Sequence, residues 1–245
     1  MVAFPMADKT VAIIQSCYIP WKGFFDIIRR VDEFILYDEV QFTRRDWRNR
    51  NLIKTAAGLK WLTIPVTNKG HYHAAIRDIL VADPAWTGQH WQTLSHVYRK
   101  AACFSEVAPF IEELYRGCAE IRLSEVNRYF ISSLCAYLEI STPLSWSWDY
   151  PVQSDDRTQR LVELCRAAGA TCYLSGPSAK AYMDLERFNR AGIEVEYMDY
   201  SGYPVYRQLH GGFEHGVSVL DLLFNEGKEA RRFLDRSVAE EKPFG

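Results

Sequence analysis

Residues 156–198 read DRTQRLVELCRAAGATCYLSGPSAKAYMDLERFNRAGIEVEYM, and this stretch decides the fold class. It alternates amphipathic helical patterns with short runs rich in β-branched and aromatic residues. The predicted elements are, in order, a helix over Asp156–Ala168 closed by Gly169, a strand over Thr171–Ser175, a helix over Pro177–Arg190 closed by Gly192, and a strand over Ile193–Met198. Strands and helices that alternate in this way are typical of a parallel, doubly wound sheet.

The same alternation is present at the start of the chain. TVAIIQ (Thr10–Gln15) predicts a buried strand, Gly23–Val31 a helix and Glu33–Asp38 a second strand. The further predicted strands are Trp61–Val66, Ile76–Val81 and Leu144–Trp148. A final helix is expected over Ser218–Phe224, where Ser218 and Asp221 have the spacing of a capping box.

The middle of the chain is helical in pattern. Helices are expected after Pro84, with Asp83 as the cap, then over Phe104–Cys118 and over Leu123–Leu138, where Ser124 and Asn127 give a weak cap signal. We therefore expect an α/β fold with a doubly wound, mainly parallel sheet. Residues 10–240 would form one domain, with a helical insertion at about 84–140 and tails at 1–9 and 241–245.

Composition narrows the function classes. The chain has 29 Lys and Arg against 31 Asp and Glu, a net charge of −2, so it is no general binder of polyanions. No apolar stretch approaches the ~18 residues that cross a bilayer, and residues 1–9 lack the pattern of a signal peptide. The six cysteines include no C-x-x-C pair and no metal-site spacing. These features predict a cytoplasmic protein with no metal.

A first candidate loop, Gln15–Asp26, lies between a predicted strand and a predicted helix. Ligands bind at the carboxyl ends of the strands in an open parallel sheet, and helix N-termini attract anions. The candidate binding residues here are Gln15, Tyr18, Trp21 and Lys22. Cys17 is a candidate nucleophile if the helix terminus and Lys22 lower its pKa. A plain strand–helix turn is the alternative.

A second candidate loop, Asp38–Arg50, follows the next predicted strand and holds four arginines within seven residues. Arginine recognises phosphate and carboxylate with two parallel hydrogen bonds, and a neighbouring aromatic ring can stack on a base or sugar. The candidate binding residues are Gln41, Arg44, Arg45, Trp47, Arg48, Asn49 and Arg50, and Asp38 is a candidate base. The alternative is a solvated charged surface.

Near the C-terminal end, His215 precedes the capped helix and is a candidate general base, since histidine titrates near neutral pH. Asp199 ends the last predicted strand and could orient His215 or hold a sugar hydroxyl. Tyr206 and Gln208 belong to a polar, aromatic loop that could act as a lid. A histidine satisfied by local backbone contacts is the alternative.

The two loops carry a family resemblance. QSCYIPWKGFFDII, followed by YDEVQFTRRDWRNRNLIKT, resembles the signature of the WbqC-like family, as do Thr171–Lys180, Gly192–Tyr200 and Phe213–Asn225. Members of this family typically carry Asn at the position of Cys17, which argues against a nucleophile there. The family is associated with surface polysaccharide and O-antigen synthesis. The resemblance implies transfer of an acyl or aminoacyl group, such as glycyl, to the amine of a nucleotide-linked amino sugar, with ATP or aminoacyl-tRNA as a possible co-substrate.

A second resemblance concerns the fold. The first strand, the Pro-Trp-x-Gly turn and the late Ser-Gly-Pro-Ser-Ala-Lys junction are similar to nucleotidyltransferases of the HIGH superfamily, without the histidines of their first loop. This implies phosphate binding at a late strand–helix junction by Ser175, Gly176, Ser178 and Lys180. Three functions remain open: an N-acyl or aminoacyl transferase, an ATP-dependent ligase or nucleotidyltransferase, and a non-catalytic nucleotide-sugar binding or scaffold protein. The sugar, the acyl donor and the oligomeric state are not fixed by the sequence.

Overall fold

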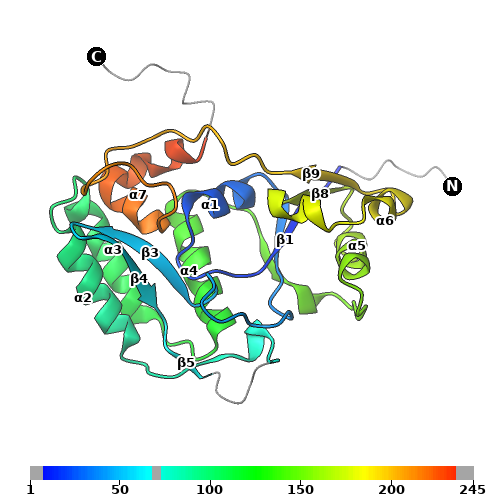
Figure 1. Ribbon diagram of the computed structural model, residues 1–245, viewed down its shortest axis with the longest axis horizontal. Helices are drawn as coiled ribbons and strands as arrows, with labels where there is room; N and C mark the ends of the chain where they lie inside the picture. The colour runs from blue at the N-terminus through cyan, green and yellow to red at the C-terminus, as the bar shows by residue number, and fades with distance from the viewer. Residues whose placement is uncertain (1–7, 68–72, 236–245) are drawn as a thin grey trace. The chain divides into compact units, whose positions relative to one another are not determined.

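The computed structural model describes residues 8–67 and 73–235, so most of the two expected tails lies outside the described residues. Its internal contacts divide the chain into two compact units, which are interleaved in sequence (Figure 1). Unit 1 contains the chain up to Gln15, Ile27–Tyr37 and Thr142–Tyr200; unit 2 contains Ser16–Asp26, Asp38–Ser141 and the chain from Ser201. The single domain over residues 10–240 stays a prediction.

Unit 1 is built on a five-stranded sheet in which every neighbouring pair is parallel. Its strands are β1 (Thr10–Ile14), β2 (Glu33–Leu36), β7 (Leu144–Trp146), β8 (Cys172–Ser175) and β9 (Glu194–Tyr197). Their order, β7-β2-β1-β8-β9, starts from β1 and grows outward in both directions. The prediction of a doubly wound α/β fold is thereby confirmed, in a Rossmann-like strand order.

Helices α5 (Arg157–Ala167) and α6 (Leu185–Arg190) pack on this sheet through a shared apolar core. Val162 and Cys165 of α5 and Phe188 of α6 join Val11, Ile35 and Tyr173 of the strands. The Asp156 side chain caps α5 by accepting from the Gln159 amide, and Gly169 ends it at a φ of 71°. The predicted helix over Pro177–Arg190 is wrong: a 3₁₀ turn (Pro177–Ala181) comes first, and Asp184 then caps the separate helix α6.

Unit 2 contains an antiparallel hairpin that the sequence patterns did not predict. Strands β3 (Arg50–Thr55) and β4 (Gly58–Thr63) pair directly across a tight turn. The predicted strand Trp61–Val66 is therefore misplaced, since β4 stops at Thr63 and a short β5 (Val66–Thr67) pairs with β6 (Leu80–Val81). The predicted strand Ile76–Val81 begins instead as a 3₁₀ turn (Ile76–Asp78).

The helices of unit 2 are α2 (Trp86–Tyr98), α3 (Phe104–Gly117), α4 (Leu123–Tyr137) and α7 (Val219–Glu226), followed by a 3₁₀ segment (Gly227–Leu234). Helices α2 and α3 lie side by side, and α7 contacts α3 (Figure 1). One predicted start is wrong, because α2 begins at Trp86 after the turn at Pro84. Helix α4 begins at Leu123 as predicted, but Ser124 and Asn127 lie buried inside it and do not cap it. Helix α1 (Lys22–Arg29) begins inside the first loop, one residue before the predicted start at Gly23.

Candidate functional site

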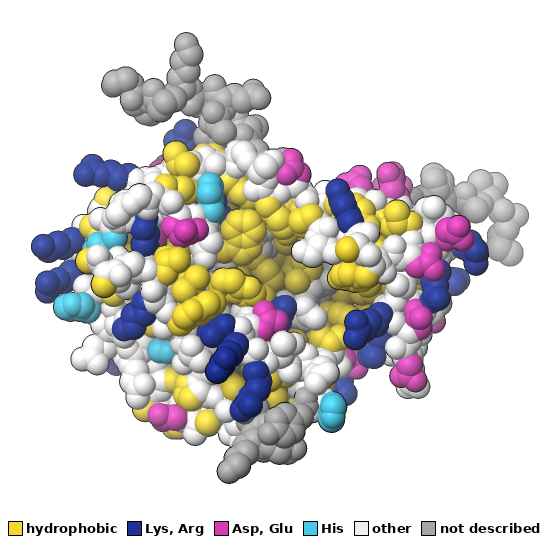
Figure 2. Space-filling model, viewed as in Figure 1, with side chains coloured by type: hydrophobic (Ala, Val, Ile, Leu, Met, Phe, Trp, Pro, Cys, Tyr) yellow, Lys and Arg dark blue, Asp and Glu magenta, His cyan; other side chains and the backbone are white. Residues whose placement is uncertain are grey.

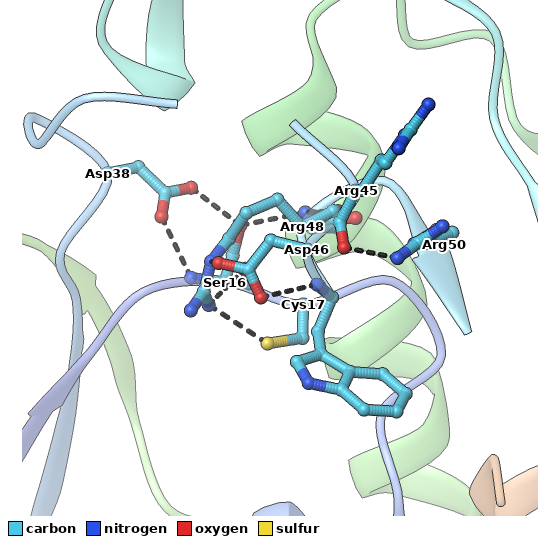
Figure 3. A network of polar contacts seen from close by, with 9 residues as sticks. Ser16, Cys17, Asp38, Arg45, Asp46, Arg48 and Arg50 are labelled. Carbon is cyan, nitrogen blue, oxygen red and sulfur yellow. Dashed lines mark hydrogen bonds and ion pairs between the residues drawn. The ribbon is translucent and has the colours of Figure 1, made fainter. Parts of the chain in front are cut away.

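The first loop is tied to the start of the second loop by a buried pair, Ser16 and Asp38 (Figure 3). The Ser16 amide donates to Asp38 Oδ1 at 2.8 Å, and the Ser16 hydroxyl donates to Asp38 Oδ2 at 2.6 Å. Asn127 on α4 donates to the same hydroxyl oxygen. Asp38 is fully buried, and burial raises the pKa of its carboxyl. The structure thus corrects the assignment of Asp38 as a base: its carboxylate holds the loop.

Tyr18 is buried as well. Its hydroxyl lies 2.9 Å from His90 Nδ1 on α2 and 2.5 Å from the Tyr115 hydroxyl on α3. Burial raises the pKa of Tyr18, so the phenol is neutral. Its predicted role in ligand binding is corrected, because the side chain lies in the core of unit 2.

Lys22 faces inward, contrary to the expectation that it binds an anion. Its ammonium donates to the Pro204 carbonyl at 2.8 Å and lies 5.2–5.7 Å from the rings of Tyr203, Tyr206 and Phe213. The side chain is 3% exposed, and burial lowers its pKa to about 8. Lys22 therefore fastens α1 to the chain after Ser201 within unit 2.

Arg48 and Asn49 of the second loop also point inward. The Arg48 guanidinium donates to the Ser16 carbonyl at 3.1 Å and to Cys17 Sγ at 3.0 Å (Figure 3). The Asn49 amide donates to the Ile64 carbonyl, and Asn49 is 6% exposed. These two side chains hold the loop in shape, which corrects the assignment of Arg48 to a phosphate clamp. Asn49 also lines the cavity that the other three arginines face, so its binding role stays a prediction.

The other three arginines of the second loop face a cavity of about 560 Å³. It is lined by Phe42, Arg44, Arg45, Asn49, Arg50 and Thr63. Figure 3 shows the Arg45 guanidinium directed away from the Ser16–Asp38 network. Figure 2 shows a group of Lys and Arg side chains beside exposed hydrophobic ones below the centre of the face in view. A cavity lined by three guanidinium groups and no carboxylate suits a phosphate or carboxylate.

A second cavity of about 340 Å³ contains His215. It is lined by Cys17, Pro20, Trp21, Phe24, Trp47, Asn51, His215 and Gly216, which brings together parts of both loops and the C-terminal histidine. The His215 ring packs edge-on against Phe213 with centroids 4.5 Å apart. Burial, and then the charge of Lys22, lower the pKa of His215, so the imidazole is neutral at pH 7 and able to accept a proton.

Cys17 lines this cavity as a thiol. Burial raises its pKa to about 11 and outweighs the opposite effect of the Arg48 charge. A nucleophilic cysteine needs its thiolate. The electrostatics therefore agree with the argument, made from the family pattern, against Cys17 as a nucleophile.

Tyr206 and Gln208 belong to a buried network and not to the lining of either cavity. Tyr206 donates to Asp221 Oδ1 at 2.9 Å, and Gln208 donates to the Tyr206 hydroxyl at 3.1 Å and to the Glu214 carbonyl at 2.8 Å. Lys54 on β3 donates to Gln208 Oε1 at 2.6 Å. These bonds hold the chain directly before His215 in place. Tyr206 and Gln208 therefore have a structural role, which corrects the ligand-binding role predicted for them. The same bonds also occupy the Asp221 carboxylate, so Ser218 caps α7 without the predicted capping box.

Gln41 of the second loop is exposed in unit 2, and its backbone pairs with Ala75. The other predicted residues belong to unit 1. Gln15 follows β1, and Gly176 follows β8. Because the strand order reverses between β1 and β8, their carboxyl ends form the edge where such sheets bind ligands. Ser178 is exposed, Ser175 is buried against Tyr173, and the Lys180 ammonium lies over the Tyr197 ring.

Two of these predictions need qualification. Ser175 and Gly176 lead into a 3₁₀ turn of five residues, so the helix N-terminus expected to bind phosphate there is absent from the described residues. Asp199 is exposed in unit 1 and His215 lies in unit 2, so the Asp199–His215 pair stays a prediction.

Sequence reasoning did not assign Phe24, Asn51 or Trp61 to the site. Phe24 and Asn51 line the His215 cavity, and Trp61 on β4 packs against Trp47 with ring centroids 5.1 Å apart. Trp61 was assigned to the start of a strand over Trp61–Val66, whereas it lies inside β4, where four of the other five residues are exposed along with it. A correct hairpin prediction would have pointed to it.

Neither a membrane span nor a metal site emerges within residues 8–67 and 73–235. No helix in this part is long and apolar enough to cross a bilayer. No group of three or more His, Cys, Asp and Glu side chains there is arranged to hold a metal ion.

Comparison with known proteins bears on the identity of the chain. It is 50% identical over 226 residues, 92% of this chain and 97% of the other, to the uncharacterized protein Rv1507c of Mycobacterium tuberculosis. No solved structure matches the chain significantly. The model of the WbqC-like protein family matches residues 15–233, which include both loops and His215. The chain therefore belongs to the WbqC-like protein family.

Proposed function

We propose that this protein transfers an acyl or aminoacyl group to the amine of a nucleotide-linked amino sugar. The class of reaction comes from what the WbqC-like resemblance implies about surface polysaccharide synthesis. The observation that carries the proposal is the pairing, in one unit, of a three-arginine cavity with a cavity that contains a neutral histidine.

The two cavities are joined by a short series of contacts. Trp47 lines the His215 cavity and packs on Trp61, and Trp61 carries the Arg50 guanidinium 3.9 Å above its ring. Arg50 lines the arginine cavity. A ligand in which a sugar ring separates an amine from an anionic diphosphate can therefore engage both, and a nucleotide-linked amino sugar has this form.

The chemistry assigned to His215 is general base catalysis. The amine of the sugar attacks the carbonyl carbon of an activated acyl donor, and the new C–N bond forms as the bond from that carbon to the donor's leaving oxygen or sulfur breaks. The imidazole takes the proton that the amine loses and passes it to the leaving group. A histidine whose pKa is lowered by burial is in the required neutral form at pH 7.

Replacement of His215 tests this assignment. We expect His215→Gln to lower the rate of acyl transfer about 100-fold or more, as loss of a general base does, while UDP-glucosamine binds as before. Product formation is followed by mass spectrometry with UDP-glucosamine and glycyl-tRNA, and binding by calorimetry. His210→Gln is the matched control, since His210 lies on the same loop but contacts the Val97 carbonyl. Unchanged turnover in His215→Gln would remove His215 from the reaction.

A second candidate, an ATP-dependent ligase or nucleotidyltransferase of HIGH-like fold, is favoured by the strand order of unit 1. The reversal between β1 and β8 places Gln15 and Gly176 at the edge where Rossmann-like sheets bind nucleotides. Product formation that requires ATP and releases pyrophosphate would favour this candidate over the transferase. Ligand binding without turnover under any donor would favour a non-catalytic binding protein.

A further inference from the structure

Two tryptophan side chains lie open to solvent between the two cavities of unit 2. Trp47 is 40% exposed and Trp61 is 39% exposed, and their ring centroids are 5.1 Å apart. Large aromatic rings usually lie inside a protein, and an exposed pair marks a surface that contacts a ligand or a partner.

Contacts within unit 2 hold the Trp61 ring and the Trp47 backbone in place. The Arg50 guanidinium stacks 3.9 Å from the Trp61 ring, and the Trp47 carbonyl accepts a hydrogen bond from the Tyr18 amide at 3.1 Å. Because Tyr18 belongs to the buried core, Trp47 is fixed at its backbone. A rigid aromatic surface binds a ligand without a large loss of side-chain entropy.

The angle between the rings indicates the shape of the ligand. The two planes are inclined at 46°, so a flat nucleobase can stack on one ring but not on both. A pyranose ring is puckered and presents C–H groups in more than one plane, so it can contact both rings at once. In unit 1, by contrast, Trp146 and Trp148 stack on each other at 16° and leave no such angle.

The position of the pair points to the same part of the ligand. Trp47 adjoins the His215 cavity, and Trp61 adjoins Arg50 of the arginine cavity. In a nucleotide-linked amino sugar, the sugar ring lies between the amine and the diphosphate. We infer that Trp47 and Trp61 form the surface on which the sugar ring stacks, an inference that rests on the proposed function and adds the residues that recognise the sugar.

The test compares UDP-glucosamine with UDP, since the two differ by the sugar alone. We expect wild-type protein to bind UDP-glucosamine more tightly than UDP, and Trp47→Leu to lose about three- to tenfold of that preference while its affinity for UDP is kept. Trp148→Leu, which removes a ring of the stacked pair in unit 1, is the matched control and keeps the preference. Affinities are measured by calorimetry, and thermal melts confirm that each variant is folded.

The other outcomes contradict the inference in distinct ways. An equal loss for UDP and UDP-glucosamine in Trp47→Leu would mean that the ring stacks on the base. An unchanged preference in Trp47→Leu, or no preference in wild-type protein, would mean that the pair does not recognise the sugar. In that case the proposed function would still stand if binding of UDP depends on Arg45. Failure of wild-type protein to bind either probe would overturn the proposed function together with this inference.

Discussion

The segments Ser16–Asp26 and Asp38–Arg50 both mix polar and aromatic residues, but unit 2 uses them differently. In the first loop, the side chains of Ser16, Tyr18 and Lys22 are buried and hydrogen-bonded within the unit. In the second loop, Arg44, Arg45 and Trp47 are exposed, and only a minority, including Arg48 and Asn49, turn inward. A mixture of polar and aromatic residues therefore marks both a structural loop and a binding loop.

This difference shows what decides the role of a polar side chain in such a loop. Ser16 is hydrogen-bonded to both Asp38 and Asn127, which links three segments of the chain and directs these side chains away from a ligand. Arg45 has a left-handed backbone (φ 60°) that turns its side chain outward toward the cavity. Substitutions in the inward set should thus reduce stability, and those in the outward set should reduce binding.

The largest effect on stability is expected at Asp38. Asp38→Ala leaves the buried Ser16 amide and hydroxyl without their acceptor, and it should lower the free energy of unfolding by about 2–4 kcal/mol. Urea denaturation measures this loss. Asp46→Ala is the control on the same loop. Asp46 is half-buried and accepts a hydrogen bond from the amide of Trp47, the next residue, so a loss of less than about 1 kcal/mol is expected. Equal losses in the two variants would contradict the assignment of Asp38 to the inward set.

A smaller effect, dependent on pH, is expected at Lys22. Burial lowers its pKa to about 8 in the folded protein, below the ordinary 10.5. The unfolded chain therefore binds more protons between pH 8 and 10.5, and the contribution of Lys22 to stability rises with pH across this window. The cost of burying the charge is fully present below pH 8. Urea denaturation of wild-type protein and of Lys22→Met, each at pH 7.5 and pH 10, isolates the contribution of Lys22 to the free energy of unfolding.

Wild-type protein should gain stability relative to Lys22→Met as the pH rises. The comparison with the variant is needed because buried thiols such as Cys135, whose pKa is raised to about 12, change stability in the opposite sense at high pH. A constant difference between the two proteins at both pH values would show that Lys22 is not buried as a charged group.

Much of the fold follows from periodicity alone. Helix α5 and strands β8 and β9 are long enough, and are bounded clearly enough by Asp156, Gly169 and Gly192, for the pattern to place them. The hairpin β3–β4 was missed because its first strand, RNLIKT, begins in the arginine loop and its second strand is mostly exposed, so neither has the apolar run of a buried strand. The 3₁₀ turn at Pro177 was missed because Asp184, the cap of the next helix, lies inside a continuous helical pattern.

For the candidate site, the sequence predicted the segments but not the directions of their side chains. The arginine loop, Trp21, Trp47 and His215 do line cavities of unit 2. Asp38, Tyr18 and Lys22 do not. Asp38 binds Ser16, and the partners of the other two come from α2, α3 and the chain after Ser201, so no local pattern relates these side chains to their partners. Hydrogen bonds between residues distant in sequence are what a single sequence does not reveal.

The contrast between outward and inward arginines is tested most directly by calorimetric titration of UDP into Arg45→Ala and Arg48→Ala, with thermal melts of both. We expect Arg45→Ala to weaken UDP binding by about 1–3 kcal/mol with an unchanged melting temperature, since it removes a charge-assisted contact to phosphate. Arg48→Ala should lower the melting temperature, because it leaves the Ser16 carbonyl without its donor, and should bind UDP nearly as well. If Arg48→Ala loses UDP affinity at full stability while Arg45→Ala retains it, the division of the two loops into structural and binding parts is contradicted.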